Sequence, residues 1–507
     1  MAVGSLKVVT SPVELRVTAS LWARIRSQVL QEDFDEHGGV IFCSRAVTNT
    51  RTSLLARDFI AAIDGVDYVP SAVGYRELTA SFIRHAVLRA RREHLVPLFV
   101  HGHGEGDSVE FSSTDLNSHA RSYPSLIEIT GTEVGAVVMT DEAVAGELWL
   151  VDGRFVDVDA TVVLSHNIKR FTPRRTYAGA ASPYQDRQVR LFGHRGQAIL
   201  AASTVGIVGV GGAGMLAVEY LSRLGVGRII AIDPDRVEPT NVPRLPGSTM
   251  RDTRSIFMTN RLPERIRKLV QRRPTPKVKI ARRLAIQAGQ GTSVEMLQLN
   301  VATVAATQAL KNCDYIVLAA DSDTAQNVVN TIGHQYLIPI IQVGVKIAAD
   351  DQGALTELFA IIRAIRPGEW CLSCSGIIDF AHLALESLPG RERALADYGT
   401  GEPAPSVITL NAIGASNAVT RIMLELTGLM EPGAAEQFLI HPSRGTVERR
   451  FTSGTTTCQI CSEENGVVGL GDLQALKLPS PLIADTSVTT RESSTHSRPE
   501  PHLGRKA

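Results

Sequence analysis

The sequence lacks the features that mark a membrane, secreted or nucleic-acid-binding protein. It contains no run of about 18 or more apolar residues, so we expect no membrane-spanning helix and no membrane partner. Its 52 basic and 52 acidic residues cancel, so the overall charge does not favour nucleic acid as a partner. The first residues show no basic segment followed by an apolar core, so we expect no secretory signal. These absences predict a cytoplasmic protein.

Cysteine is scarce, with six residues in a chain of 507, and this excludes a disulfide scaffold. Four of the six form two C-x-x-C pairs: Cys371 with Cys374, and Cys458 with Cys461. Two such pairs can close a tetrahedral zinc site with no open position, which would be structural; two unrelated pairs or a redox pair are the alternatives. Cys43 and Cys313 lie in apolar stretches, where we expect small core residues.

The order of the predicted elements divides the chain into two units of an α/β protein. Residues 1–168 predict an α+β unit, and residues 169–183 form a basic linker with proline and glycine. Over residues 184–476, strands, a Gly-rich turn and helices alternate, which predicts a parallel, doubly wound, Rossmann-like sheet. Residues 477–507 are rich in Ser, Thr and Pro and predict a disordered tail.

A possible metal site lies in the stretch VHGHGEGDSVEFSSTD of the first unit. His101 and His103 occupy alternate positions at the end of a predicted strand, so both imidazoles point to one face. Asp115 follows at the start of a predicted helix, and two imidazoles with one carboxylate are a common catalytic zinc set. Glu36, just before a Gly-Gly strand, is a candidate general base. The alternative is that the histidines are incidental.

Glu36, His101-x-His103 and Ser112-x-x-Asp115 together resemble the pattern of the JAB/JAMM (MPN-domain) isopeptidases. The resemblance implies that His101, His103 and Asp115 hold a catalytic Zn²⁺. It implies that Glu36 moves a proton from the zinc-bound water to the leaving amine, while Ser112 steadies the oxyanion. A JAB-like unit that binds a substrate tail without cutting it is the alternative.

The loop between these motifs departs from the family pattern in two ways. Proline usually follows the second histidine, where this chain has Gly104. Eight residues separate His103 from Ser112, one more than we expect for the family.

A nucleotide-binding fingerprint opens the second unit. Gly209-x-Gly211-x-x-Gly214 stands between a predicted strand and a predicted helix, where glycines let the backbone approach phosphate. Asp233 ends the next strand and could accept hydrogen bonds from ribose hydroxyls. This pattern alone predicts a dinucleotide or adenine nucleotide, so a nicotinamide dehydrogenase is an alternative.

The flanking motifs resemble the ThiF superfamily, the adenylyltransferases that activate ubiquitin-like and sulfur-carrier proteins, over about residues 184–462. The carrying motifs are Arg187-Gln188, GxGGxG, Asn241-x-x-Arg244, PKVKIARRL with Lys277, and Asp321 nine residues before Asn330. The implied nucleotide-binding residues are Gly209, Gly211, Gly212, Gly214, Asp233 and Asn241. Arg187, Arg244 and Lys277 would offset phosphate charge, and Asp321 would bind Mg²⁺. A long insertion before Lys277 leaves Lys279 as its alternative.

The same resemblance implies cofactors and partners. ATP and Mg²⁺ would serve adenylation, and the paired cysteines would hold the family's structural Zn²⁺. The partner would be a ubiquitin-like or sulfur-carrier protein with a C-terminal glycine, passed on to a sulfur donor or a conjugating enzyme. The family also implies a homodimer in which Arg187 reaches the neighbour's site. Neither Cys43 nor Cys313 stands where the family's thioester cysteine would, so we expect no conventional thioester.

The two resemblances together predict a fused enzyme in which one unit processes what the other activates. The arrangement resembles bacterial fusions tied to ubiquitin-like modification or sulfur transfer. A sulfur-metabolism enzyme that yields a thiocarboxylate and a binding scaffold with degenerate sites stay open. Residues 261–283 carry ten Lys or Arg and one Glu; we interpret them as a solvated face, with a surface for an acidic partner or the ATP phosphates as the alternative.

Overall fold

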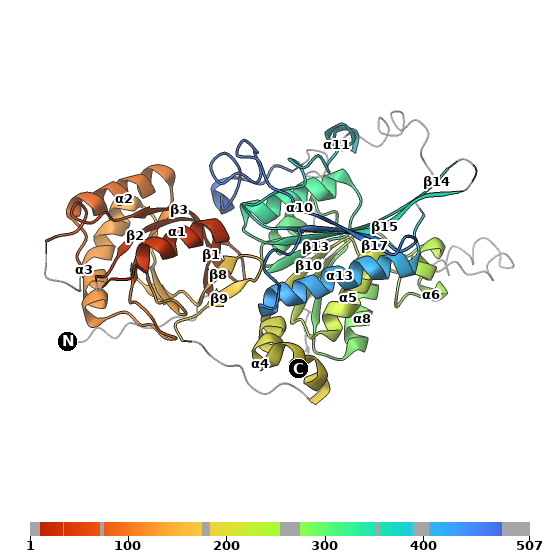
Figure 1. The fold of residues 1–507 in the computed structure, drawn as a ribbon, viewed down its shortest axis with the longest axis horizontal. Helices are drawn as coiled ribbons and strands as arrows, with labels where there is room; N and C mark the ends of the chain where they lie inside the picture. Colours follow the sequence, from red (N-terminus) through yellow and green to blue (C-terminus); the bar gives the residue numbers. More distant parts are fainter. Residues whose placement is uncertain are drawn as a thin grey trace, which may run out of the picture.

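The computed structural model describes residues 11–478, apart from residues 34, 71–75, 175–182, 254–273, 351, 353, 387 and 389–404. Two sheets form the centres of two units that lie side by side (Figure 1). Most of the predicted linker, the predicted tail beyond residue 478 and residues 261–273 of the basic stretch lie outside the described residues. Within the described part of the chain, no helix has both the length and the apolar character needed to cross a bilayer.

The first unit is built on a nine-stranded mixed sheet in the order β7-β6-β5-β4-β2-β3-β1-β8-β9. Its strands are β1 (Val13–Thr18), β2 (Gly38–Val47), β3 (Thr52–Ala61), β4 (Val96–Gly102), β5 (Val134–Met139), β6 (Val144–Trp149), β7 (Phe155–Asp157), β8 (Ala160–Leu164) and β9 (Lys169–Phe171). Its helices are α1 (Ala19–Val29), α2 (Ala80–Glu93) and α3 (Ser113–Thr130). Strand β9 pairs with β8, so the first sheet extends into the range predicted as linker.

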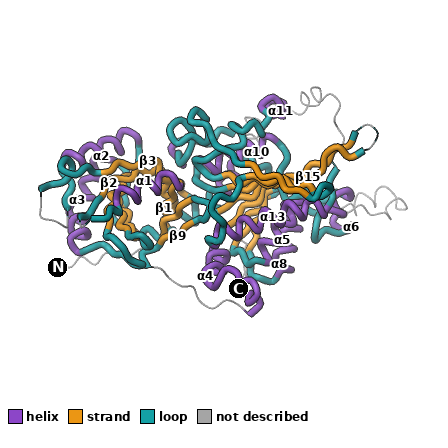
Figure 2. Tube along the Cα trace, viewed as in Figure 1, coloured by secondary structure: helices purple, strands orange, loops and turns teal. Residues whose placement is uncertain are grey.

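Both faces of this first sheet are covered, because successive side chains of a strand point to opposite faces. In β2, Ile41 and Cys43 pack in the cluster that contains α1. Val40 and Phe42, on the other face, pack against α2. Helices therefore lie on both sides of the strands (Figure 2).

The second unit holds an eight-stranded sheet in the order β12-β11-β10-β13-β14-β15-β16-β17. Its strands are β10 (Thr204–Val208), β11 (Arg228–Ile232), β12 (Ser293–Leu297), β13 (Tyr315–Leu318), β14 (Ile340–Ala349), β15 (Leu355–Ile365), β16 (Gln437–His441) and β17 (Thr446–Arg450). Its helical segments are η1 (Pro183–Gln185), α4 (Asp186–Ala202), α5 (Gly212–Arg223), η2 (Pro239–Arg244), α6 (Met250–Thr253), α8 (Lys277–Ala288), α9 (Val304–Leu310), α10 (Asp323–Gln335), α11 (Phe380–Glu386), α13 (Ile408–Thr427) and η4 (Gly471–Leu473).

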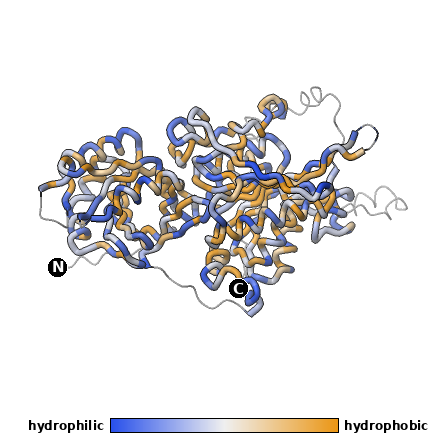
Figure 3. Tube along the Cα trace, viewed as in Figure 1, coloured by the Kyte–Doolittle hydropathy of each residue, from blue (hydrophilic) through white to orange (hydrophobic). Residues whose placement is uncertain are grey.

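The prediction of a parallel sheet is confirmed for five strands and wrong for three. Strands β12, β11, β10, β13 and β14 pair in parallel, as a Rossmann-like fold requires. Strands β15, β16 and β17 are antiparallel, because short connections join β14 to β15 and β16 to β17 and such connections cannot lead to a parallel partner. Helices α5, α8 and α13 cover one face and α9 and α10 the other. Hydrophobic residues accordingly follow the central strands (Figure 3).

Candidate functional sites

The residues predicted to form a metal site converge at one end of the first sheet. Strands β2 and β4 are antiparallel with Gly38 opposite His101, so Glu36 lies beside the end of β4. Ligand atoms of His101, His103 and Asp115 all lie within 4.8 Å of one another. The carboxylate of Glu36 approaches His103 Nε2 to 3.9 Å. Three segments of the chain therefore bring their polar side chains to one place.

The geometry of these three ligands fits a zinc ion. His101 Nε2 lies 3.1 Å from His103 Nε2 and 3.6 Å from Asp115 Oδ2. Ligand atoms bound to a tetrahedral zinc ion at its usual N and O distances would be separated by about 3.3 Å. Burial, followed by the neighbouring His101, lowers the pKa of His103 and favours the neutral imidazole that a metal needs. The set supplies three ligands and leaves a fourth position for water.

Asp115 is held in place by the start of α3. Ser112 is the N-cap residue, and its hydroxyl accepts a hydrogen bond from Asp115 N. Asp115 Oδ2 accepts in return from Ser112 N at 2.9 Å and from Ser112 Oγ at 2.7 Å, which completes a capping box. Burial opposes ionisation of Asp115, but hydrogen bonds from His101 and Ser112 outweigh it and hold its pKa below the ordinary value. Asp115 is therefore a fixed carboxylate.

Glu36 has the electrostatic setting of a general base. Its side chain is about one-third exposed, and burial raises its pKa. His101 lowers that pKa and Asp115 raises it, and the balance stays above the ordinary value for glutamate. A carboxylate that can hold a proton closer to neutral pH is suited to accept one and pass it on.

The loop after His103 has a backbone conformation that proline could not adopt at position 104. Gly104 has a φ of +74°, whereas proline is restricted to a φ near about −65°. The loop is held instead by Gly106, which donates to Asp141 Oδ1 at 2.8 Å and accepts from Thr140 Oγ1 at 2.6 Å. The glycine at position 104 thus belongs to a loop whose conformation keeps His103 close to His101 and Asp115.

A buried pair of side chains that was not expected from the sequence lies on α3 and β6. His119 lies one turn beyond Asp115 on α3, and its Nδ1 is 2.6 Å from Glu147 Oε1. Trp149 Nε1 donates to the same carboxylate oxygen at 2.8 Å. The four-residue spacing of Asp115 and His119 on one helix face was the only available signal.

The Gly-rich turn of the second unit is a backbone structure that glycine alone permits. Gly209 has a φ of +85°, and a Cβ there would lie 2.8 Å from the carbonyl oxygen of Ala319. A Cβ at Gly214 would overlap the carbonyl oxygen of Gly209. A Cβ at Gly211 would meet nothing within 4 Å, so this position faces open space at the start of α5. The helix N-terminus is thus open at the carboxyl end of β10, a setting suited to phosphate.

Asp233 and Lys277 lie beside this turn. Asp233 directly follows β11, and its two carboxylate oxygens accept from Val210 N at 2.9 Å and from Asp235 N at 2.8 Å. Lys277 Nζ lies 4.0 Å from Asp233 and 2.7 Å from Asp235. Lys279 is exposed and lines a separate groove with Arg282 and Arg283. Of the two alternatives, Lys277 is therefore the lysine beside the turn.

The other predicted nucleotide-site residues lie around the same edge of the sheet. Asn241 and Arg244 belong to η2, whose Arg244 carbonyl oxygen lies 3.5 Å from a Cβ placed on Gly212. Asn241 is buried, and its Oδ1 accepts from Glu238 N at 3.2 Å. Asp321 is exposed just beyond β13, at the carboxyl end of that strand.

Arg187 is not brought to the turn within the single chain. It is exposed on α4, and the adjacent Gln188 donates to the carbonyl oxygen of Leu224 at 3.2 Å. Leu224 follows α5, whose 12 residues separate it from the Gly-rich turn. A helix of that length spans about 18 Å, so a role for Arg187 would require a second subunit.

Two further features near the second site were missed from the sequence. The amide of Asn411, on α13, packs against Gly212 closely enough to overlap any Cβ placed there. Asp323, His382 and Glu386 bring ligand-type atoms within 4.8 Å of one another. Their carboxylates are engaged, because Glu386 accepts from Thr324 N at 2.8 Å and Asp323 from His382 Nδ1 at 2.7 Å. We therefore interpret these contacts as stabilising the start of α10, and we do not interpret the cluster as a metal site.

The two C-x-x-C pairs come together as predicted. Cys371 Sγ lies 3.6 Å from the sulfurs of Cys374 and Cys458, and Cys374 Sγ lies 3.7 Å from Cys461 Sγ. Four thiolates around a tetrahedral zinc ion at its usual bond length would be separated by about 3.8 Å, so the cluster fits zinc. A hydrogen bond from Cys461 lowers the pKa of Cys371 to about 4.

The turn that contains Cys371 and Cys374 is held by hydrogen bonds to a residue of α10. Asn330, which is fully buried, accepts from Leu372 N at 3.0 Å and donates to Ser373 Oγ at 3.3 Å. The two remaining cysteines are protonated thiols, because burial raises the pKa of Cys313 to about 12 and that of Cys43 further. Both are therefore poor nucleophiles.

A family model described as the ThiF family matches residues 185–445. Over 53 residues the chain is 52% identical to the tRNA threonylcarbamoyladenosine dehydratase of Bacillus subtilis (strain 168), covering 10% of this chain and 21% of that protein. Over 52 residues it is 44% identical to the SAMP-activating enzyme E1 of Haloferax volcanii, covering 10% and 19%. The chain thus spans about a fifth of the length of these curated relatives.

Solved structures are similar to the chain at lower identity. E. coli MccB with ATP has a TM-score of 0.42 at 18% identity and covers 56% of this chain and 75% of its own. PaaA has a TM-score of 0.40 at 16% identity and covers 55% and 77%. The range matched by the family model begins after the first sheet, so His101, His103 and Asp115 lie outside it.

Proposed function

The chain belongs to the ThiF family, and from this we propose that it uses ATP to adenylate the C-terminal glycine of a ubiquitin-like or sulfur-carrier protein. The observation that carries the proposal is the grouping of the Gly-rich turn, Asp233 and Lys277 at the carboxyl ends of parallel strands. Nucleotides bind doubly wound sheets at this edge.

In the proposed reaction the glycine carboxylate attacks the α-phosphate of ATP and pyrophosphate leaves. Negative charge builds on the phosphate oxygens, and the open N-terminus of α5, Lys277 and Arg244 would stabilise it. Asp233 would accept hydrogen bonds from the ribose. Asp321 would hold Mg²⁺, which neutralises phosphate charge when bound. Arg187 would come from the other subunit of a homodimer.

ATP–pyrophosphate exchange tests this proposal with a ubiquitin-like protein ending in Gly-Gly as the probe. The wild-type chain should exchange label, and Asp321→Ala should abolish exchange. Asp152→Ala alters an exposed carboxylate of the first unit and serves as a control that should exchange normally. Exchange that survives in Asp321→Ala would remove Asp321 from the proposed site.

We propose as a second function that the first unit is a JAB/JAMM-like zinc (iso)peptidase that trims a precursor tail or cleaves a conjugate. The convergence of Glu36 on His101, His103 and Asp115 supports it. Zinc bound there would polarise the carbonyl and lower the pKa of its water to about 7. Glu36 would take the proton from that water and give it to the leaving amine. Ser112 Oγ donates to Asp115, so a role toward the oxyanion requires it to leave that hydrogen bond.

Cleavage of the same probe carrying a short C-terminal extension tests the second function. Glu36→Gln should lose cleavage and keep ATP–pyrophosphate exchange, whereas Asp321→Ala should do the reverse. Unchanged cleavage in Glu36→Gln would remove Glu36 as the base. If the wild-type chain binds the extended probe without cutting it, the alternative holds: sulfur-carrier activation for a thiocarboxylate, with a JAB-like unit that only binds.

The acceptor of the activated glycine is proposed to lie on another protein. Cys43 and Cys313 are fully buried, and the other four cysteines in the chain form the metal-type cluster. A sulfur donor or the cysteine of a conjugating enzyme would therefore receive the acyl group. Mass spectrometry of the chain after reaction with ATP and the probe should show no thioester-linked adduct.

A further inference from the structure

The two units are joined by a packed interface. Ala46, Leu55 and Leu164 of the first sheet belong to the same hydrophobic cluster as Val208 and Ile230 of the second. Part of one face of the first sheet is thus buried by the second unit. Separating the units would return these side chains to water, which costs free energy in proportion to the apolar area exposed.

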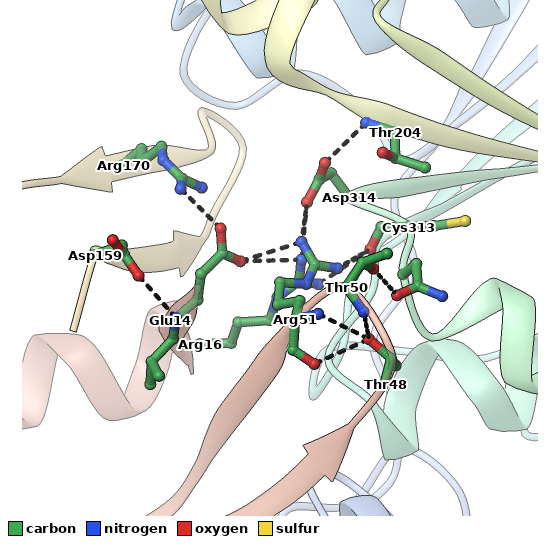
Figure 4. A network of polar contacts seen from close by, with 12 residues as sticks. Glu14, Arg16, Thr48, Thr50, Arg51, Asp159, Arg170, Thr204, Cys313 and Asp314 are labelled. Carbon is green, nitrogen blue, oxygen red and sulfur yellow. Dashed lines mark hydrogen bonds and ion pairs between the residues drawn. The ribbon is translucent and has the colours of Figure 1, made fainter. Parts of the chain in front are cut away.

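A buried ionic network fixes the register of this interface (Figure 4). Arg16 and Arg51, from β1 and the β2–β3 turn, donate to Asp314 Oδ1 at 2.9 and 2.7 Å. Glu14 lies 3.2 Å from Arg51 and 2.7 Å from Arg170. Arg16 and Arg51 are at least nine-tenths buried. Moving one unit against the other would leave buried charges without partners.

A third contact comes from residues 466–474, here called the strap, which follow the second C-x-x-C pair. Its Gly469 carbonyl oxygen accepts from Ser44 Oγ at 2.5 Å, and Asp472 Oδ2 accepts from Val47 N at 2.9 Å. The other Asp472 oxygen pairs with Lys311 Nζ at 2.7 Å. Glu463, just before the strap, accepts from Thr18 Oγ1 at 2.8 Å. The strap therefore ties β2 to the second unit.

These contacts lie at the ends of the strands that are remote from both candidate sites. In β2, Val47 touches the strap, whereas Gly38 lies opposite His101. The ten residues of β2 span about 30 Å. In the second unit, Asp314 precedes β13 and Asp321 follows it, a separation of about 20 Å. Figure 1 shows the consequence: α3, with Asp115, and α6, which follows Arg244, lie at opposite ends of the molecule.

We infer that the two candidate sites face opposite ends of one rigid body, so a polypeptide tail processed at the first site must leave the chain before it is adenylated. This inference rests on the proposed function for the roles of the sites, but its geometry does not. Hydrolysis at the first site breaks a C–N bond, adds the oxygen of water to the acyl carbon and releases the amine with a proton. The product is a free carboxylate, which any copy of the chain could then adenylate.

The distance between the sites can be measured without a substrate. Leu116 on α3 and Met250 on α6 are 46% and 43% exposed, and each can be replaced by an amino acid that carries a spin label. When the labelled chain is diluted with an excess of unlabelled chain, so that a dimer carries only one pair of labels, we expect a single distance that ATP and Mg²⁺ leave unchanged. A second, shorter population on adding ATP and Mg²⁺ would overturn the inference. Asp472→Ala removes the contacts of the strap with Val47 and Lys311 and should broaden the distribution of label distances. An unbroadened distribution would contradict the proposal that the strap holds the two units together.

A mixing experiment tests the release of the tail. Glu36→Gln and Asp321→Ala chains are combined, each at the concentration of a wild-type reference, so that both samples contain equal numbers of each intact site. With the extended Gly-Gly probe, pyrophosphate release by the mixture should match the wild type within about twofold. A mixture several-fold slower would show direct transfer between sites of one chain. Absence of pyrophosphate release from wild type with a probe already ending in Gly-Gly would contradict the proposed function, while the distance measurement would still decide the inference.

Discussion

The candidate zinc site and the candidate nucleotide site are built from different parts of the chain. The zinc site consists of side chains, and all of its proposed ligands come from one chain. The nucleotide site is mainly backbone: a turn that excludes Cβ atoms, the open start of α5 and carboxyl ends of strands. The arginine predicted for this site, Arg187, is exposed on α4, and its neighbour Gln188 contacts Leu224 at the far end of α5. The first site should therefore be complete in a single chain, whereas the second depends on backbone shape and a neighbouring subunit.

The largest expected effect removes the first site altogether. His101→Ala with His103→Ala takes away two of three ligands, so zinc should fall from two ions per chain to one and cleavage should be abolished. Elemental analysis of purified protein measures the zinc. The control His85→Ala alters an exposed histidine of α2 and should keep both ions. Cys371→Ser should lose the other ion; if instead all zinc disappears with Cys371→Ser alone, the first site is metal-free as purified.

The buried ionic network at the interface between the two units should be the next most sensitive to substitution. Asp314→Asn leaves Arg16 and Arg51 without their shared carboxylate, and breaking a buried ion pair costs about 3–5 kcal/mol of unfolding free energy. Denaturant unfolding measures the change. Asp152→Asn, whose partner Arg154 is also exposed, is the matched surface control and should leave stability nearly unchanged.

The contribution of this ionic network to the free energy of unfolding should fall as the pH is lowered. Burial opposes ionisation of Asp314, but Arg51 and Arg16 outweigh it and hold its pKa below the ordinary value. A lowered folded-state pKa contributes stability above the ordinary aspartate pKa of about 3.9, and this contribution is lost as the pH falls through the lowered value. Wild type should therefore lose stability over this acidic range more steeply than Asp314→Asn. Parallel pH profiles of the two proteins would contradict this assignment.

Lys277 should matter less to the nucleotide site than the two histidines matter to the zinc site. Lys277→Ala removes one cation beside Asp233, and loss of one electrostatic contact to developing charge typically costs about 100-fold in rate. Lys279→Ala, two residues along α8, removes an exposed cation and should leave exchange within about twofold. Initial rates of ATP–pyrophosphate exchange distinguish the two lysines. Equal losses in both variants would point to a general charge effect of α8.

The sequence predicted what is encoded in local patterns. Strand alternation and the Gly-rich turn indicated the Rossmann-like sheet, which the family match confirms, and the C-x-x-C spacing indicated the cysteine cluster. The antiparallel strands β15 to β17 were missed, because pairing direction depends on connections that sequence patterns do not define. The buried ionic network at the interface was missed too, because Arg16 and Asp314 are nearly 300 residues apart and only the folded chain brings them together. Asn411 reaches Gly212 for the same reason.

The smallest expected effect on stability tests the backbone character of the nucleotide site most directly. In Gly214→Ala the new Cβ would overlap the carbonyl oxygen of Gly209, and relieving such overpacking typically costs about 1–3 kcal/mol. In Gly211→Ala the Cβ would point into open space, so unfolding should be nearly unchanged. ATP binding should separate the two effects: Gly211→Ala should weaken it with normal stability, because its methyl group occupies the space where phosphate is proposed to bind. Normal ATP affinity in Gly211→Ala would mean that phosphate does not approach this turn, and the nucleotide would have to bind elsewhere along the strand ends.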